Sequence, residues 1–176
     1  RSSDLKLYAQ SYTGIAQFAQ TIRNRVFFTS SSKTLNTIKD GKIEVVYDFS
    51  GILSHKDIYA IHAYHIDDSG RFFNGYIYGN MVIDNLFAAK LKVRNYKSSI
   101  KSSGAIKNMV GVGDMLYVNN GNTVKQADYR MVEPGDSLIY SQVSDMNEFL
   151  TYFKLAKAPD NSIWYCNSEH LDRKSV

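Results

Sequence analysis

The residues best suited to chemistry lie in one stretch, 56–86, where two histidines and two adjacent aspartates occur close together. The spacing of His62 and His65 would let both bind one metal ion if they lay on a helix. Apolar and other residues alternate around them, which indicates a strand, and side chains three apart on a strand point to opposite faces. We therefore expect no metal site, and we expect each histidine ring to be hydrogen-bonded within a packed sheet.

Asp67 and Asp68 could form a carboxylate pair for acid–base or metal chemistry. They are followed by Ser69 and Gly70, and aspartates in a tight turn usually accept hydrogen bonds from their own backbone. No calcium-loop spacing follows them. We therefore predict that they form the turn of a β-hairpin whose strands are 58–66 and 72–83.

Nucleophilic chemistry has little support. The single cysteine, Cys166, lies four residues before His170, and an extended strand would separate their α-carbons by ~13 Å, too far for a nucleophile and its base. The sequence also lacks a phosphate-binding glycine loop, a dinucleotide fingerprint and a nucleophile elbow. We predict no catalytic residues, no metal, no cofactor and no enzymatic activity.

The aromatic residues of the predicted hairpin are the best candidates for a binding surface, because tyrosine offers a large amphipathic contact area at low entropic cost. Neither face of the hairpin is purely polar, which predicts a central position in a sheet. We expect a small ligand or a protein partner to contact Tyr59, His62, Tyr64, Tyr76 and Tyr78.

The stretch 90–107 offers an alternative, since it holds six basic residues and no acidic one. If it is extended, its basic side chains could follow phosphates while a tyrosine ring stacks on a base. The candidate nucleic-acid contacts are Lys90, Lys92, Arg94, Tyr96 and Lys97. The competing interpretation is a solvated edge strand whose lysines protect it against association.

Two segments have helical periodicity. Between residues 4 and 28, apolar positions recur at alternating intervals of four and three, after the capping residues Ser2, Ser3 and Asp4. A similar pattern follows Ser144 and predicts a helix over 145–156. The segments 85–94 and 149–155 stay open between helix and strand.

The other segments have the composition of strands. They are 42–49, a hairpin formed by 115–118 and 123–127 around an Asn-Gly turn, 137–143 and 163–166. We therefore predict an α+β fold in which an amphipathic N-terminal helix packs on a mostly antiparallel sheet of about five to seven strands, with a short helix near the C-terminus. We expect a single domain over 1–176, with the helix at about 4–28 and a β-rich body at about 42–170.

Composition is that of a soluble globular protein, with 44% apolar and 22% charged residues and a net charge of +4 in 176 residues. No run approaches the ~18 apolar residues of a membrane span, so any membrane attachment would lie outside this chain. The chain begins with Arg1, which predicts a piece of a longer protein. Compartment stays open, with an extracytoplasmic or surface location favoured.

A helix followed by meandering hairpins is an architecture of extracytoplasmic sensor domains and of pilin-like heads. By this analogy we predict a non-catalytic binding or sensing module of a longer membrane-anchored or surface protein. Two other classes stay open. A structural or adhesion subunit of a virus, phage or pilus would form homo-oligomers. A nucleic-acid-binding domain would use the basic stretch.

Overall fold

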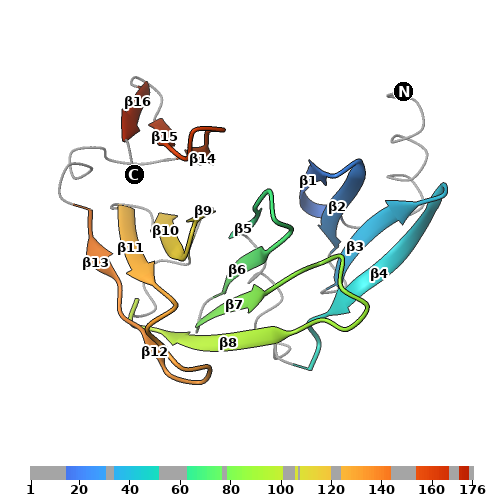
Figure 1. Cartoon of the computed structure of the whole chain (residues 1–176), viewed down its shortest axis with the longest axis horizontal. Coiled ribbons are helices and arrows are strands. Elements are labelled where there is room, and N and C mark those ends of the chain that lie inside the picture. The colour runs from blue at the N-terminus through green and yellow to red at the C-terminus, as the bar shows by residue number, and fades with distance from the viewer. Residues whose placement is uncertain are drawn as a thin grey trace. The chain divides into compact units, whose positions relative to one another are not determined.

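The computed structural model describes residues 15–30, 34–51, 63–76, 79–100, 106, 108–119, 124–143, 154–166 and 171–174 (Figure 1). Every regular element in these residues is a β-strand. Among them, no helix is long and apolar enough to cross a membrane. The strands form four sheets. The chain divides into two compact units, residues 1–61 and 62–176, and each is described by itself.

The first unit contains one antiparallel meander of four strands. Both of its described two-residue turns have positive φ at each residue: 49° and 61° at Arg23 and Asn24, and 49° and 75° at Asp40 and Gly41. This is the geometry of type I′ turns, whose twist matches that of paired strands. The strands in chain order are β1 (Ile15–Ile22), β2 (Arg25–Ser30), β3 (Thr34–Lys39) and β4 (Lys42–Asp48).

The predicted helix over 4–28 is wrong in its described part, because β1 and β2 occupy these residues. Apolar residues four apart share a face of a strand as well as a face of a helix, so the observed spacing did not separate the two. The ladder between β1 and β2 is irregular between Ile15 and Gln20 and regular from Gln20 to Ile22. The turn at Arg23 and Asn24 then ends the first strand, since consecutive residues with positive φ cannot continue a right-handed helix.

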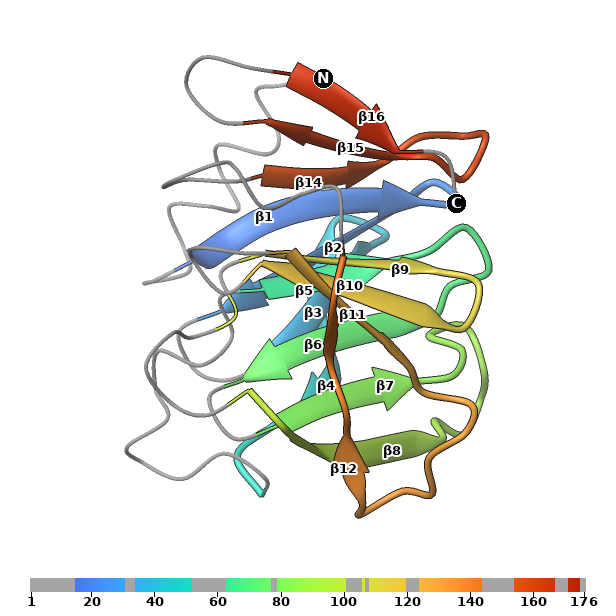
Figure 2. The ribbon, with the colours of Figure 1, turned by 90° about the vertical axis from the view of Figure 1, so that its left-hand side faces the viewer.

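The second unit contains three sheets, built mainly from consecutive strands (Figures 1 and 2). The β5–β8 sheet comprises β5 (Ala63–Ile66), β6 (Phe72–Tyr76), β7 (Gly79–Ile83) and β8 (Val93–Ser98). The β9–β11 sheet comprises β9 (Asn108–Val112), β10 (Met115–Asn119) and β11 (Val124–Asp128). The third sheet comprises β14 (Lys154–Lys157), β15 (Ile163–Cys166) and β16 (Leu171–Lys174). The first strands of successive sheets are in contact, since β9 contacts β5 and β14 contacts β9. This is how neighbouring blades of a β-propeller are arranged.

The α+β prediction is wrong, and the described protein is all-β. The predicted C-terminal helix over 145–156 ends inside β14, and its first part, 145–153, lies outside the described residues. The predicted strand over 72–83 is two strands, β6 and β7. The hairpin predicted around the Asn-Gly turn is confirmed, because β10 and β11 pair antiparallel from Met115↔Asp128 to Asn119↔Val124.

One segment joins the two larger sheets. After β11 the chain forms β12 (Ser137–Leu138), which pairs in parallel with β8, and then β13 (Ser141–Gln142), which pairs with β11. Leu138 is fully buried in the core between the sheets. The hydroxyl of Tyr140 donates a hydrogen bond of 2.9 Å to Oδ1 of Asn80. The segment 137–142 therefore pairs with the outer strand of each sheet, β8 in one and β11 in the other.

One core cluster of the second unit lies between the β5–β8 sheet and the β9–β11 sheet, and another lies between the β9–β11 sheet and the third sheet. The side chains of the first cluster come from one face of each sheet and include Phe73, Val82, Tyr96, Leu116 and Val118. Phe73 lies against the backbone of Gly111 in β9, where a Cβ atom would come within 2.4 Å of its ring. This face of the β5–β8 sheet is thus occupied by packing. The opposite face carries the residues considered next.

Candidate functional site

Of the residues predicted to contact a ligand, the structure describes Tyr64 in full. Tyr59, His62, Tyr78 and the side chain of Tyr76 lie outside the described residues. Tyr64 belongs to β5, and its half-buried ring stacks on Phe72, with the ring centroids 5.8 Å apart. Its hydroxyl is buried and has no hydrogen-bond partner. Burial raises the pKa of this hydroxyl above its ordinary value.

Tyr64 is the first member of a row of side chains that crosses the β5–β8 sheet. The ladder pairs Tyr64 with Asn74, Asn74 with Met81, and Met81 with Asn95. Residues directly opposite on neighbouring strands project from the same face, so the four side chains lie side by side. We call Tyr64, Asn74, Met81 and Asn95 the polar row. Its two middle members are buried, with Asn74 0% and Met81 2% exposed, while Tyr64 and Asn95 are half-buried.

The polar row holds four buried polar atoms without a hydrogen-bond partner. They are the hydroxyl of Tyr64, both side-chain atoms of Asn74 and Oδ1 of Asn95. Most buried side-chain polar atoms in proteins are paired, and each unpaired group costs about 1–3 kcal/mol of stability. A concentration of such atoms in one row is therefore unfavourable for folding alone. Tyr64 and Asn95 are half-buried, so a partner could reach the row at these two ends.

The surroundings of the polar row are apolar on one side. The next row of the same face is formed by Ile66, Phe72, Ile83 and Val93. On the other side, the neighbouring row includes Gly79 and Lys97, and Lys97 is exposed. No member of the polar row is charged. The site can therefore exchange hydrogen bonds, and it presents no described acid, base or nucleophile to a bound molecule.

The sequence interpretation missed Asn74 and Asn95. The sequence could have marked these two positions, because asparagine is depleted in strands and both residues occur within runs of strand composition. An asparagine in such a run needs an explanation, either a local turn or a buried hydrogen bond. Only the pairing of β6 with β7 and of β7 with β8 places these two residues in one row.

The charged residues near the β5–β6 turn contrast with the polar row because they are paired. Arg71 Nε lies 2.6 Å from Oδ2 of Asp67, and its Nη1 donates to Oδ1 of Asp114 at 3.2 Å and to the hydroxyl of Tyr129 at 2.8 Å. Burial raises the pKa of Tyr129 to about 12. These contacts join the β5–β6 turn to the β9–β10 turn and to the end of β11. We interpret them as structural, since their hydrogen bonds are internal.

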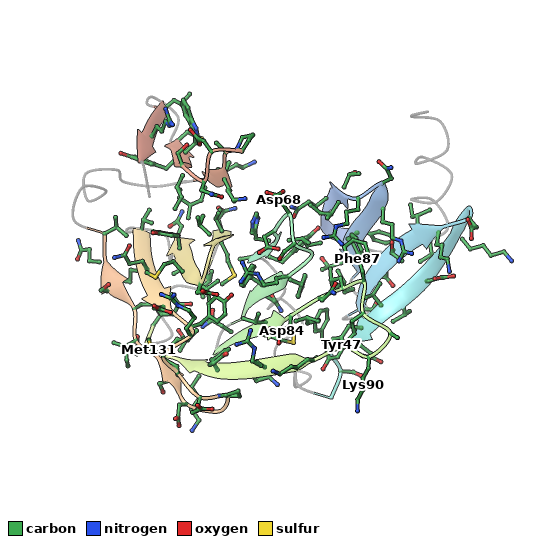
Figure 3. All side chains as sticks on the ribbon, viewed as in Figure 1. Tyr47, Asp68, Asp84, Phe87, Lys90 and Met131 are labelled. Carbon is green, nitrogen blue, oxygen red and sulfur yellow. The ribbon has the colours of Figure 1, made fainter. Side chains whose placement is uncertain are left out.

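Asp67 makes the turn that the sequence predicted. Its Oδ1 accepts hydrogen bonds from Ser69 N at 3.0 Å and from Arg71 N at 2.9 Å. Burial alone would raise the pKa of Asp67, but the hydrogen bonds from Ser69 and Arg71 outweigh it and lower the pKa. Asp68 is exposed in the same turn and pairs with Lys157 Nζ at 2.8 Å (Figure 3). Across the part of the chain that is described, no group of three potential metal ligands occurs.

His65 points to the face of β5 opposite Tyr64, as the strand period required. Its ring stacks on Phe73, with centroids 6.3 Å apart and an interplanar angle of 17°. Its Nε2 is buried and lacks the hydrogen bond that we expected. Burial lowers the pKa of His65 to about 4, although Asp67 acts in the opposite direction. His65 is therefore neutral near pH 7.

The basic stretch contains exposed lysines and a buried tyrosine. Lys90, Lys92 and Lys97 are exposed, and Lys90 extends away from the ribbon (Figure 3). Arg94 is ion-paired with Asp84. Tyr96 is 1% exposed, and its hydroxyl accepts a hydrogen bond of 3.2 Å from Arg94 Nη1. Tyr96 thus offers no exposed ring face for stacking, and the nucleic-acid interpretation stays a prediction that depends on the lysines.

Several solved structures share this fold at low sequence identity. One is the extracellular domain of a protein named as a hybrid two-component system from B. thetaiotaomicron, with 15% identity and a TM-score of 0.61 over 92% of this chain and 21% of that chain. A streptogramin B lyase matches with 9% identity and a TM-score of 0.56 over 90% of this chain and 53% of that chain. Virginiamycin B lyase from Staphylococcus aureus matches with 12% identity and a TM-score of 0.54 over 90% of this chain and 54% of that chain.

These likenesses establish the fold alone. The chain corresponds to about a fifth of the first structure and about half of each lyase. No protein-family model matches the sequence, and no curated protein sequence matches it.

Two asparagines allow the unpaired state of the polar row to be tested. Asn74 and Asn80 are both 0% exposed and lie on neighbouring strands, but only Asn80 has a side-chain partner, Tyr140. Asn74→Leu keeps the side-chain branching and removes two unpaired groups, so we expect unfolding free energy to rise by about 1 kcal/mol. Asn80→Leu removes the unpaired Nδ2 of Asn80 but leaves the Tyr140 hydroxyl without its acceptor, so we expect this variant to be less stable than Asn74→Leu by about 1 kcal/mol.

Denaturant unfolding of both variants measures these changes. The measurement needs no ligand and compares two buried asparagines in the same sheet. Equal losses of stability in the two variants would mean that Asn74 is paired in the native protein.

Proposed function

We propose that this chain is a non-catalytic binding or sensing module of a longer protein, and that the polar row is its ligand contact. The observation that carries the proposal is the set of unpaired buried atoms on Tyr64, Asn74 and Asn95. Buried polar groups without partners reduce stability, and strained or unsatisfied groups concentrate where a protein binds something. A bound molecule that pairs with them would recover this free energy.

The ligand that suits this row is small or narrow, polar and uncharged. The row lacks a charged side chain that could neutralise an ionic group, and burying an unpaired charge beside it would be costly. Phe72 and Ile83 in the adjacent row are fully buried and form the apolar side of the row. Tyr64 contributes both properties, because its ring covers apolar surface and its hydroxyl can donate or accept a hydrogen bond.

The sensing role and the location are supported by the structural likenesses. The extracellular domain of a protein named as a hybrid two-component system covers nearly this whole chain. We propose by this analogy that the longer protein places this module outside the cytoplasm and responds to its occupancy. The absence of a nucleophile–base pair and of a phosphate-binding loop from the sequence supports a non-catalytic role.

A thermal-shift measurement with uncharged polar probes tests the proposal. We expect at least one of the uncharged probes acetamide, a capped dialanine peptide and sorbitol to raise the melting temperature of the full chain by about 3–5 °C at about ten times its Kd. The shift should disappear in Asn74→Leu, because that variant has no hydrogen-bonding group at the centre of the row. Comparison with this variant also removes the general stabilisation that polyols give to any protein.

Acetate is the charged control, and we expect it to give no difference between the wild-type chain and Asn74→Leu. Asn80→Leu is the matched variant, since it alters a buried asparagine on the other face of the same sheet. It should respond to probes like the wild-type chain. Identical responses of the wild-type chain and Asn74→Leu to every uncharged probe would refute the polar row as a ligand contact.

A further inference from the structure

The sheets of the second unit pack face to face in chain order. In the β9–β11 sheet, Leu116 belongs to the core cluster shared with the β5–β8 sheet, and the next residue, Tyr117, belongs to the cluster shared with the third sheet. The third sheet supplies Leu155, Ile163 and Tyr165 to this second cluster. The β9–β11 sheet is therefore packed on both of its faces, and the third sheet uses one face in the same way.

The other face of the third sheet is mainly apolar and accessible. Side chains alternate along a strand, so the residues between the buried ones point to this face. We call it the outer face, and the strand pairings place its members in two rows: Lys154, Cys166 and Leu171, and then Ala156, Trp164 and Arg173. Leu171 is 67% exposed, and Ala156 is exposed as well. Trp164 and Cys166 are half-buried.

The charge of Arg173 is balanced within the third sheet. Its guanidinium is ion-paired with Asp160, and its Nε donates a hydrogen bond of 3.0 Å to Oγ of Ser162. The guanidinium carbon lies 5.9 Å from the centroid of the Trp164 ring. Because these contacts are internal, what the centre of the outer face offers to a partner is apolar surface. Apolar side chains are what packed sheets place between them.

We propose that a further antiparallel β-sheet of the longer protein packs on the outer face, with its first strand beside β14. The contacts between successive first strands, β5 with β9 and β9 with β14, give this geometry. The solved structures of this fold contain more chain than the matched part, since this chain covers 53% of the streptogramin B lyase and 21% of the extracellular domain. The inference shares with the proposed function only the view that this chain is a module of a longer protein, and it does not depend on the polar row.

The reactivity of Cys166 measures whether the outer face is covered. It is the only cysteine of the sequence. Its alkylation by N-ethylmaleimide, followed by mass spectrometry of the peptide that contains it, is compared between the chain 1–176 and the mature protein as its source makes it. We expect alkylation in the mature protein to be at least about tenfold slower, because a thiol beneath a packed sheet reacts only after local opening. The chain unfolded in denaturant gives the reference rate.

A substitution at Leu171 tests the packing itself. In the chain 1–176, Leu171→Lys should change the melting temperature by less than about 1 °C, since the side chain is mostly exposed. In the mature protein it should lower the melting temperature by about 3–5 °C, because the ammonium group would lie between two sheets. Met131→Lys is the matched control. Met131 is 84% exposed and follows β11, so we expect a change below about 1 °C in both proteins.

Two results would overturn the inference. Equal alkylation rates in the two proteins would mean that the outer face is open in both or is covered within residues 1–176. Protection of Cys166 that grows with the concentration of the chain 1–176, together with a dimer in analytical ultracentrifugation, would identify a second copy as the occupant. Trp164 is the only tryptophan of the sequence, so its emission would shift with that dimer.

The same measurements separate this inference from the proposed function. The thermal-shift probes report on the polar row, and Cys166 reports on the outer face. A protected Cys166 without Asn74-dependent probe binding would refute the polar row alone. Asn74-dependent probe binding with equal alkylation rates would refute this inference alone.

Discussion

Gly111→Ala is expected to lower the free energy of unfolding by about 2–3 kcal/mol and the melting temperature by about 5–10 °C. Gly111 lies in β9, and an added Cβ would lie 2.4 Å from Cε2 and 2.7 Å from Cδ2 of Phe73. Real Cβ atoms essentially never approach other heavy atoms so closely. Either the ring of Phe73 or the backbone of β9 would therefore have to move.

Phe73 has little freedom to move. The residue is fully buried, and its ring meets Tyr129 edge-on, with the centroids 5.7 Å apart. The ring of His65 stacks nearly parallel to it. The guanidinium carbon of Arg71 lies 5.7 Å from the ring centroid. Because these neighbours confine the ring, we expect the added methyl group to separate the β5–β8 sheet from the β9–β11 sheet.

Thermal and denaturant unfolding followed by circular dichroism measure the effect. Gly51→Ala is the control, since its Cβ would meet no atom within 4 Å and its backbone conformation suits any residue. We expect that variant to change stability by less than about 0.5 kcal/mol. Adding Phe73→Leu to Gly111→Ala should recover part of the loss through coupling between the two sites. Similar small effects of both alanine substitutions would contradict the described contact.

Acidification from pH 7 to pH 4.5 is expected to destabilise the wild-type chain by about 2 kcal/mol more than His65→Gln. Burial lowers the pKa of His65 to about 4, with Asp67 and Asp68 opposing and Lys157 reinforcing the effect. An unfolded histidine has a pKa of about 6.5, so the unfolded state binds more protons between these two values. Stability due to neutral His65 is therefore present above pH 6.5 and is lost as the pH falls toward 4.

The comparison with His65→Gln isolates this histidine from the carboxylates. The pKa of Asp67 is lowered, so its contribution is present above the unfolded value of about 3.9 and is lost at lower pH in both proteins. Denaturant midpoints at half-unit intervals from pH 7 to pH 4.5 provide the data. Parallel pH profiles for the two proteins would show that His65 titrates normally and that its ring is hydrated.

Local sequence was sufficient where turn chemistry decided the structure. The Asn-Gly pair predicted a hairpin, and β10 and β11 pair as that hairpin requires, while the turn residues 120–123 lie outside the described residues. Asp67 was assigned to a turn because its side chain can bond the following backbone, and it does so. The same strand period placed His65 on the face opposite Tyr64, while its predicted counterpart His62 lies outside the described residues. These outcomes depend on neighbours within a few residues.

Local sequence did not distinguish a helix from a strand where the spacing of the apolar residues fits both. Ile15 and Ala19 could share a face of either a helix or a strand, and the segment proved to be a strand. The turn at Arg23 and Asn24 carried the missing signal, but Arg-Asn is not among the usual pairs for a type I′ turn. Asp40 and Gly41 form such a pair, and they support the strand assignment on both sides of them.

What the sequence by itself determined is the tendency of short segments to turn or extend, and the absence of familiar catalytic motifs. What only the tertiary structure decided is which strands are neighbours. The parallel pairing of β12 with β8 and the alignment of Asn74 with Asn95 across β7 depend on register between distant segments. Whether a buried polar atom has a hydrogen-bond partner depends on every residue that surrounds it in the folded protein. The candidate site consists of such atoms, so local sequence identified Tyr64 and could not identify the row to which it belongs.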